Sequence, residues 1–192
     1  MKHLLRIVVS FFSMLDFGER KNEGDVALNT SVGSLAERCV ESWLEQEGWL
    51  CFERNMRVPG GEIDRLFVRE RGRSGLRVDL CVAEVKATRI SRKKDINSLF
   101  SSAKMRSLIR PNQLRVLWRS AALYERQLCS LTQSPVRTYV RYFLVVYAEQ
   151  RMLRELRIYL DTANTDLPVR VCRVTRENLI LAWSPEVALH SF

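Results

Sequence analysis

The stretch Gly61-Glu62-Ile63-Asp64 is followed twenty residues later by Glu84-Val85-Lys86, and these two short sequences decide the fold. Each adjoins an apolar run of the kind that forms a buried strand. Residues two apart in a strand face the same way, so Glu62 shares a face with Asp64, and Glu84 with Lys86. If the two strands are neighbours in one sheet, two carboxylates and one lysine meet at the same place.

The residues around these stretches predict a sheet. Residues 49–54 predict a first strand, and Pro59-Gly60-Gly61 predicts a turn. Residues 62–68 predict a second strand, whose period of two places Glu62, Asp64, Leu66 and Val68 on one face. Residues 69–77 predict a hairpin loop, and the apolar run 78–85 predicts a strand that is covered on both faces.

An acidic residue at the end of a buried strand lowers stability unless another group compensates its charge. A cation between Asp64 and Glu84 would do so, and Mg²⁺ or Mn²⁺ prefers such oxygen ligands. The ion would polarise a phosphate and activate a bound water, while Lys86 would position that water or stabilise the developing charge. Metal-assisted cleavage of a phosphodiester needs such a set of residues. The alternative is an ion pair of Lys86 with Asp64 or Glu84.

A helix is predicted after Gly33, because apolar residues recur every three or four positions as far as Leu44. Ser34 and Glu37 have the spacing of a capping box at its start, and Gly48 is expected to follow its end. Glu37 also lies at the edge of the apolar stripe. Two roles therefore stay open for Glu37: it caps the helix, or it points across the sheet toward the carboxylates.

The order of the motifs in this part of the chain resembles a known family. The motifs are Gly33-x-x-Ala36-Glu37, Gly48-Trp49, Arg54-Asn55, Gly61-Glu62-Ile63-Asp64 and Ala83-Glu84-Val85-Lys86. Together they resemble the uncharacterised bacterial UPF0102 (YraN-like) family, whose fold is similar to that of archaeal Holliday-junction resolvases within the PD-(D/E)XK nuclease superfamily. The resemblance covers about residues 32–163.

This resemblance implies an α/β fold with a restriction-endonuclease-like core, in which a central mixed β-sheet is flanked by α-helices. It also implies that Asp64, Glu84 and Lys86 match the Asp…Glu-x-Lys core, and that Glu37 is the acidic residue borne on the helix. One departure lies in the next helix, predicted at about 111–127 and packed on the sheet. The family usually has a Lys-Gln pair early in this helix, whereas this chain has Asn112-Gln113. Lys104 is a candidate substitute for the missing lysine.

The segment 86–126 is the most polarised part of the chain. Its positive charges predict contacts with the sugar-phosphate backbone, which are independent of base sequence and sensitive to salt. The alternative is a solvated helix face. The candidate nucleic-acid-binding residues are Arg89, Arg92, Lys93, Lys94, Lys104 and Arg106. We expect recognition of nucleic acid, and of DNA in particular, by shape more than by sequence.

The remainder of the chain predicts further strands. Residues 139–147 predict a strong strand, 156–160 a shorter one, and 169–174 with 179–183 a hairpin. A helix is expected to start at Ser184-Pro185-Glu186. We divide the chain into an N-terminal apolar segment and linker (1–31), a nuclease-like domain (32–163) and a C-terminal extension (164–192).

Composition sets further limits. The 192 residues carry a formal net charge of +9, which attracts polyanions such as nucleic acid or an anionic membrane surface. The five cysteines are widely spaced, which predicts reduced thiols in a cytoplasmic protein. The apolar residues 1–17 are too few to span a bilayer, which takes about 20 residues, so no stable membrane insertion is expected. They predict an appended helix or a peripheral membrane contact.

Three functions stay open from the sequence. The favoured one is a metal-dependent endonuclease for DNA, branched or structured DNA included, with Mg²⁺ or Mn²⁺ on Asp64 and Glu84. Lys86 would assist the attacking water, and Glu37 would complete the site through a second metal or a metal-bound water. The alternatives are a non-catalytic nucleic-acid-binding protein that retains the fold, and a membrane-associated or assembly protein that uses residues 1–17. A homodimer is a candidate assembly, because resolvase-like enzymes often act as dimers on two-fold symmetric junctions.

Overall fold

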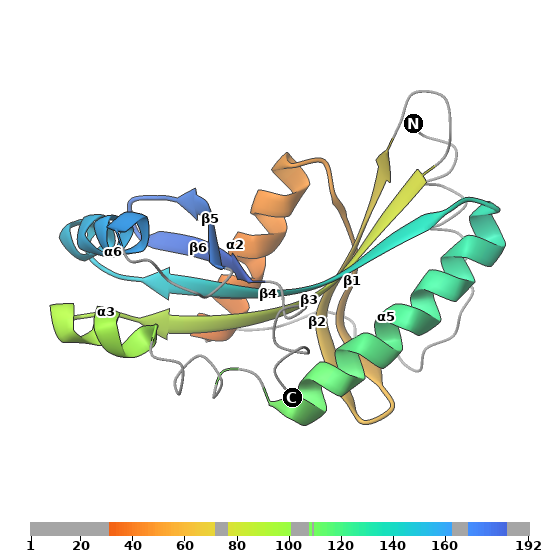
Figure 1. Ribbon diagram of the computed structural model, residues 1–192, viewed down its shortest axis with the longest axis horizontal. Helices are drawn as coiled ribbons and strands as arrows, with labels where there is room; N and C mark the ends of the chain where they lie inside the picture. The colour runs from red at the N-terminus through yellow and green to blue at the C-terminus, as the bar shows by residue number, and fades with distance from the viewer. Residues whose placement is uncertain (1–30, 72–76, 101–107, 109, 163–168, 184–192) are drawn as a thin grey trace.

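Six strands form one sheet in the part of the chain that the computed structural model describes, which is residues 31–71, 77–100, 108, 110–162 and 169–183. The spatial order is β1-β2-β3-β4-β6-β5 (Figure 1). The strands are β1 (Leu50–Val58), β2 (Gly61–Arg71), β3 (Arg77–Arg89), β4 (Val136–Tyr147), β5 (Val169–Val174) and β6 (Asn178–Trp183). The β3–β4 pair is parallel and the other pairs are antiparallel, so the sheet is mixed.

Helices cover both faces of the sheet (Figure 1). On one face, α2 (Val32–Gln46) packs its apolar stripe against alternate residues of β3 and β4, among them Phe143 and Val145. On the other face, α5 (Pro111–Thr132) packs on β2 and β3. α3 (Lys93–Leu99) and α6 (Gln150–Thr162) pack there on the far half of β4, around Leu144 and Val146. The predicted α/β class, a central mixed sheet flanked by helices, is confirmed and is consistent with a restriction-endonuclease-like core.

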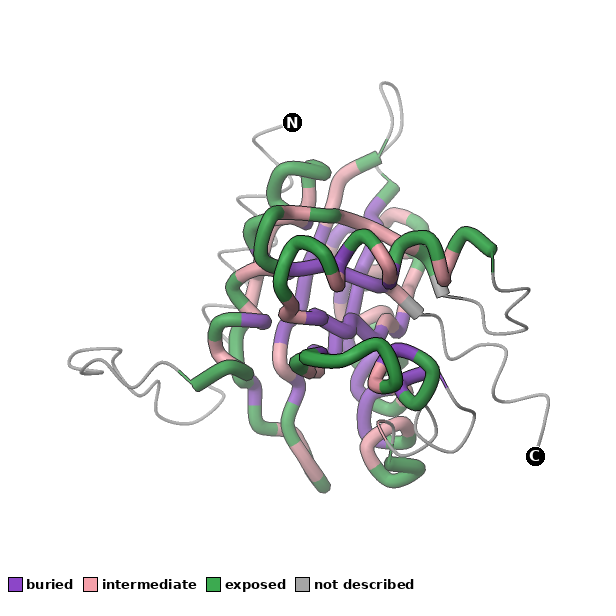
Figure 2. The backbone as a smooth tube through the Cα atoms, turned by 90° about the vertical axis from the view of Figure 1, so that its left-hand side faces the viewer, coloured by how far each residue is buried: buried purple, intermediate pink, exposed green. Residues whose placement is uncertain are grey.

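The strand β3 lies at the centre of the sheet and is buried without interruption from Val78 to Val85. This confirms the expectation that its apolar run is covered on both faces. Figure 2 shows the buried residues gathered on the strands, while the outer faces of the helices are exposed. Burial ends at Lys86. The Glu84-Val85-Lys86 motif therefore lies where the strand leaves the core.

The strand predicted at 156–160 is wrong, because these residues belong to α6. The alternation of Leu156, Ile158 and Leu160 suggested one face of a strand. In the structure Ile158 is 61% exposed, whereas Leu153 and Leu156, three residues apart, are buried. That spacing is the helical one. The two strands predicted at 169–174 and 179–183 are present as a hairpin and extend the sheet beyond β4.

The ends of α2 differ in part from the expectation. Its N-cap is Ser31, whose side chain accepts a hydrogen bond from the backbone N–H of Ser34, so the predicted capping box at Ser34 and Glu37 is wrong. Gly48 follows the helix with a φ of +83°, the left-handed conformation that glycine adopts most easily, as predicted. Glu37 is thereby left for another role.

Several other bounds differ from the prediction. The helix at 111–127 is confirmed as α5 but continues to Thr132, and α3 was not predicted. The first strand runs to Val58, and Gly61 already belongs to β2. The helix predicted to start at 184–186 and the apolar segment 1–17 lie outside the described residues. Among the helices of the described part, none is long and apolar enough to cross a membrane.

Candidate active site

The carboxylate of Asp64 lies where the pairing of β2 with β3 ends. The last paired residues are Arg65 and Ala83. Beyond them, Asp64 Oδ2 accepts a hydrogen bond of 2.7 Å from the backbone N–H of Val85. A side chain thus replaces the main-chain acceptor that a continued ladder would provide. This bond fixes the Asp64 carboxylate next to Glu84.

The strict alternation of β2 fails at the same point. Ile63 packs in one core cluster with Leu66 and Val68, although a period of two would place it on the opposite face. The expectation that one face holds Glu62, Asp64, Leu66 and Val68 in regular alternation is therefore wrong here. The neighbouring strand is also irregular, because Asn55, which lies between the paired residues Arg54 and Met56, has a φ of +49°. Both strands are distorted where Asp64 leaves the ladder.

The carboxylate of Glu84 is held from two sides. Glu84 is 3% exposed, and its Oε1 is paired with Lys86 Nζ, which confirms that the two side chains point the same way. Its Oε2 accepts a hydrogen bond of 2.9 Å from Gln113 Nε2 of α5. The same Gln113 nitrogen donates to the carbonyl oxygen of Glu62 at 2.9 Å. Gln113 therefore ties α5 to both acidic strands.

Two glycines bring the β1–β2 hairpin close to α5. Gly60 has a φ of +90°, which side chains other than hydrogen rarely allow. A Cβ added to Gly61 would lie 3.2 Å from Val116 Cγ1, closer than an ordinary contact, and 3.7 Å from Gln113 Oε1. The glycines thus permit the approach that places Gln113 over Glu84.

Burial raises the pKa of both central carboxyl groups. For Asp64 this outweighs the hydrogen bond from Val85 and the charges of Lys86 and Arg65, which lower it. For Glu84, burial and the charge of Asp64 raise the pKa, against the hydrogen bonds and charge of Lys86 and Gln113. Two neighbouring carboxyl groups whose pKa values are both raised by burial, one of them also by the charge of the other, are typical of functional sites.

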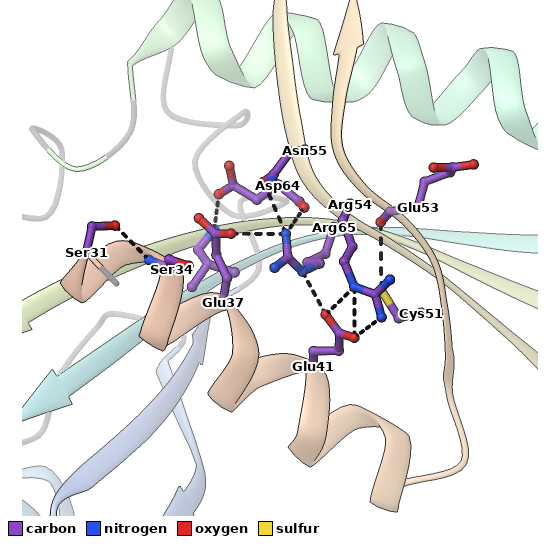
Figure 3. A network of polar contacts seen from close by, with 11 residues as sticks. Ser31, Ser34, Glu37, Glu41, Cys51, Glu53, Arg54, Asn55, Asp64 and Arg65 are labelled. Atoms are coloured by element: carbon purple, nitrogen blue, oxygen red, sulfur yellow. Dashed lines mark hydrogen bonds and ion pairs between the residues drawn. The ribbon is translucent and has the colours of Figure 1, made fainter. Parts of the chain in front are cut away.

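Glu37 is brought to this place from α2 and contacts Arg65 (Figure 3). Its Oε2 lies 3.0 Å from Arg65 Nη1, and the Arg65 side chain is only 4% exposed. Burial raises the pKa of Glu37; the charge of Arg65 lowers it, and that of Asp64 raises it. Of the two roles that the sequence left open, the structure supports orientation toward the sheet.

A second glutamate continues this network one helical turn away. Glu41 Oε2 accepts a hydrogen bond of 3.0 Å from Arg65 Nε, and both Glu41 oxygens lie 3.0 Å from Arg54 Nε. Burial raises the pKa of Glu41, but the hydrogen bonds and charges of the two arginines outweigh it and hold the pKa below its ordinary value. Figure 3 shows these side chains converging from α2, β1 and β2.

The basic candidates are placed only in part. Arg89 ends β3, three residues beyond Lys86, and Arg92 caps the start of α3. Lys93 and Lys94 are exposed in the first turn of α3. Lys104 and Arg106 lie outside the described residues. Whether Lys104 substitutes for the lysine that is missing beside Gln113 therefore stays a prediction. The described basic side chains thus follow the site along β3 and into α3.

Arg65 and Gln113 were not among the predicted site residues. A signal for Arg65 was available, because an arginine inside the apolar run 63–68 needs a carboxylate partner. Glu37 and Glu41 lie four residues apart and so share one helix face, which makes them the natural partners. For Gln113, the sequence drew attention only to the lysine that is missing beside it.

The residues present fit a divalent ion held by two carboxylates. Asp64 and Glu84 are adjacent, and each keeps oxygen lone pairs beyond the hydrogen bonds described above. Within the described ranges, no group of three or more histidine, cysteine or acidic side chains converges on one point. Mg²⁺ often binds proteins through one or two carboxylates, with water and substrate phosphate as the other ligands. The donor set suits that mode.

The six-stranded mixed sheet with helices on both faces is consistent with a restriction-endonuclease-like core. The chain belongs to the family described as Uncharacterised protein family UPF0102, whose profile matches residues 36–147. This match runs from α2 to the end of β4 and includes Glu37, Asp64, Glu84 and Lys86. No curated protein matches the chain. The family resemblance seen in the sequence is confirmed.

Proposed function

We propose that the protein is a divalent-metal-dependent endonuclease that hydrolyses phosphodiester bonds in DNA. The observation that carries this proposal is the hydrogen bond from Val85 N–H to Asp64 Oδ2, which holds one carboxylate beside a second, Glu84, at the end of a buried strand. Family membership supports a nuclease-like protein in general. The reaction and the substrate are the additions made here.

Asp64 and Glu84 would bind one Mg²⁺ or Mn²⁺. When bound, such an ion supplies charge stabilisation at a phosphate oxygen and lowers the pKa of a coordinated water. A cation would offset the burial that raises the pKa of both carboxyl groups, and the charge of Asp64 that raises the pKa of Glu84 further, which supports this assignment. Gln113 and Lys86 hold the two oxygens of Glu84 and so fix the direction from which it can coordinate.

In the proposed reaction, the oxygen of a water forms a bond to phosphorus while the bond from phosphorus to one sugar oxygen breaks. One proton of the water ends on the departing sugar oxygen, so the products are a phosphate monoester and a hydroxyl group. Lys86, whose side chain is 41% exposed, is the group available to position the water or to stabilise charge on the phosphate. Its pairing with Glu84 keeps the ammonium group at the site.

DNA would be held by the basic residues that follow the site. Arg89, Arg92, Lys93 and Lys94 extend from the end of β3 into α3, and contacts of this kind are made with the sugar-phosphate backbone whatever the base sequence. Recognition by shape would suit branched or structured DNA. A homodimer stays a prediction from the sequence.

One observation favours a second candidate, a non-catalytic nucleic-acid-binding protein that retains the fold. Asn112 stands where the family usually has a lysine, and it is exposed at the start of α5. The site thus lacks one positive charge near the place where a phosphate would lie. Gln113 beside it keeps its contact with Glu84, which argues for a site that is still assembled.

Purified protein incubated with branched, duplex and single-stranded DNA, with and without Mg²⁺ or Mn²⁺, tests both candidates. We expect metal-dependent cutting that is lost in Asp64→Asn and in Glu84→Gln while DNA binding persists. Asp161→Asn, on the exposed face of α6, is the matched control and should cut like the unaltered chain. Salt-sensitive binding with no cutting of any substrate would instead establish the binding protein.

A further inference from the structure

The guanidinium group of Arg65 lies at the centre of the polar network around Asp64. Its Nη1 contacts Glu37 Oε2 at 3.0 Å and donates to the carbonyl oxygen of Asp64 at 2.6 Å. The same nitrogen donates to Asn55 Oδ1 at 3.1 Å, and Nε donates to Glu41 at 3.0 Å. These contacts join α2, β1 and β2 at the point where the ladder between β2 and β3 ends (Figure 3).

We propose that Arg65 is a built-in cation that takes the place of a second metal ion, so that each chain binds one divalent ion and Glu37 holds Arg65 instead of ligating metal. This inference rests on the proposed function, in which Asp64 and Glu84 bind the ion. It specifies the metal count of that same site and gives Glu37 and Arg65 their roles.

The charges of the network balance without added metal. Glu37 and Glu41 carry two negative charges, and Arg54 and Arg65 carry two positive ones. Arg65 contacts both glutamates and Arg54 contacts Glu41, each at about hydrogen-bond distance. Arginine does not lose its proton in proteins, so this neutralisation is permanent. A second divalent ion on Glu37 would have to displace a buried guanidinium or lie within a few ångströms of its charge, which is unfavourable.

The other carboxylate group is not balanced in this way. Asp64 and Glu84 carry two negative charges, and Lys86 forms an ion pair with Glu84. One negative charge is left over, and the Lys86 side chain is 41% exposed and therefore able to move with a ligand. A cation is thus attracted to Asp64 and Glu84, whereas the charges of Glu37 and Glu41 are already neutralised by the two arginines.

Arg65 also positions the proposed metal ligand. Its hydrogen bond to the Asp64 carbonyl oxygen holds the main chain at the place where the regular alternation of β2 fails. That main-chain position lets the Asp64 side chain reach Val85 N–H. Arg65 is therefore a positioning residue for Asp64 in addition to its role as a fixed charge.

Counting bound Mn²⁺ per chain tests this inference independently of any cutting. Purified full-length chains are titrated with Mn²⁺ and the free ion is measured by electron paramagnetic resonance, with isothermal calorimetry as the second readout. We expect one ion per chain, lost in Asp64→Asn and retained in Glu37→Gln. Two ions in the unaltered chain, or loss of the ion in Glu37→Gln, would overturn the inference and leave the proposed metal site standing. No bound ion at all would overturn the proposed function and the inference together.

Removing the guanidinium charge makes the opposite prediction. The double variant Arg65→Met/Glu41→Gln leaves Glu37 without its cation, and we expect it to bind a second Mn²⁺ there. The first ion should bind more weakly than in the unaltered chain, because Asp64 loses the hydrogen bond from Arg65 to its carbonyl oxygen. Glu41→Gln alone and Arg65→Lys both keep a positive charge beside Glu37 and should bind one. Circular dichroism shows whether each variant is folded. The change Glu41→Gln is included in the double variant so that no Glu41 carboxylate faces the apolar Met side chain. A folded double variant that still binds one ion would refute the idea that Arg65 replaces a metal.

Discussion

The network around Arg65 makes a quantitative prediction for stability. Replacing Glu41 by Gln removes the carboxylate that both arginines contact, but Arg65 keeps Glu37, the Asp64 carbonyl and Asn55. We expect a loss of about 2 kcal/mol in the free energy of unfolding, the scale of hydrogen bonds to a charged group. Replacing Arg65 by Met leaves the half-buried Glu37 without its cation and should cost about 3 kcal/mol, the lower end of the range for broken buried pairs.

The two changes together should cost less than their sum. Once Arg65 is gone, Glu41 has lost one partner already, so removing its carboxylate takes away less. We expect the unfolding free energy of the double variant to be about 1–2 kcal/mol higher than the sum of the two single losses predicts. Urea unfolding followed by circular dichroism measures it. Arg54→Met is the control for a partner that is 48% exposed, and it should cost below about 1 kcal/mol. Additivity within about 0.5 kcal/mol would show that the contact between Arg65 and Glu41 contributes nothing to stability.

Three further predictions concern other parts of the molecule. Because the pKa of Glu41 is held below its ordinary value of 4.5, its contribution to stability is fully present above that pH and is lost as the pH falls through the lowered pKa. The difference in unfolding free energy between the unaltered chain and Glu41→Gln should therefore shrink below about pH 4.5, and a constant difference down to pH 3 would contradict this. Gly61→Ala forces a Cβ to within 3.2 Å of Val116 Cγ1 and should cost about 1 kcal/mol, seen as a Tm lower by about 2–4 °C; an unchanged Tm would show that the hairpin can move away. Lys93→Gln and Lys94→Gln should each weaken DNA binding and reduce the slope of log affinity against log salt by about 0.9, whereas an unchanged slope would remove these residues from the DNA interface.

The sheet could be predicted from the sequence wherever burial sets the pattern. The run from Val78 to Val85 is apolar except for Asp79 and Glu84, so it has no polar face that would suggest a helix or a surface strand. Its length suits one central strand. Asp79 is buried because Arg69 and Arg71 both pair with it. Pairs of this kind depend on which strands are neighbours, and a single sequence does not state that.

The helix α6 and the irregularity at Asp64 were harder to predict from the sequence for the same reason. A short apolar run has a similar sequence pattern in a strand and in a helix. Which of the two it forms depends on the surface that it packs on. Around Leu156 that surface is the far half of β4 together with α3. At Asp64, a regular strand would have satisfied the sequence pattern equally well. Only the contacts of Arg65 and the side-chain bond to Val85 break it.

The sequence predicted that Asp64, Glu84 and Lys86 lie close together, but it did not predict the residues that contact Glu37 and Glu84. Asp64, Glu84 and Lys86 meet as the motif spacing predicts, because two neighbouring strands bring them to one place. The partner of Glu37 is Arg65, at a position where the family motif quoted from the sequence specifies nothing. Gln113 is 29 residues from Glu84 in the chain, and no local pattern links the two, since the place of Gln113 depends on how α5 crosses the sheet.

The bond from Val85 to Asp64 has a practical consequence for spectroscopy. A main-chain amide in the middle of a sheet is normally protected by another main chain, and its hydrogen exchange reports on opening of the sheet. The amide of Val85 is protected by a side chain instead. The exchange rate and the chemical shift of this one amide therefore report directly on the Asp64 carboxylate. A single resonance in a two-dimensional nitrogen–proton spectrum would thus follow the occupancy and geometry of the site without a substrate, a product or a label at the carboxylate.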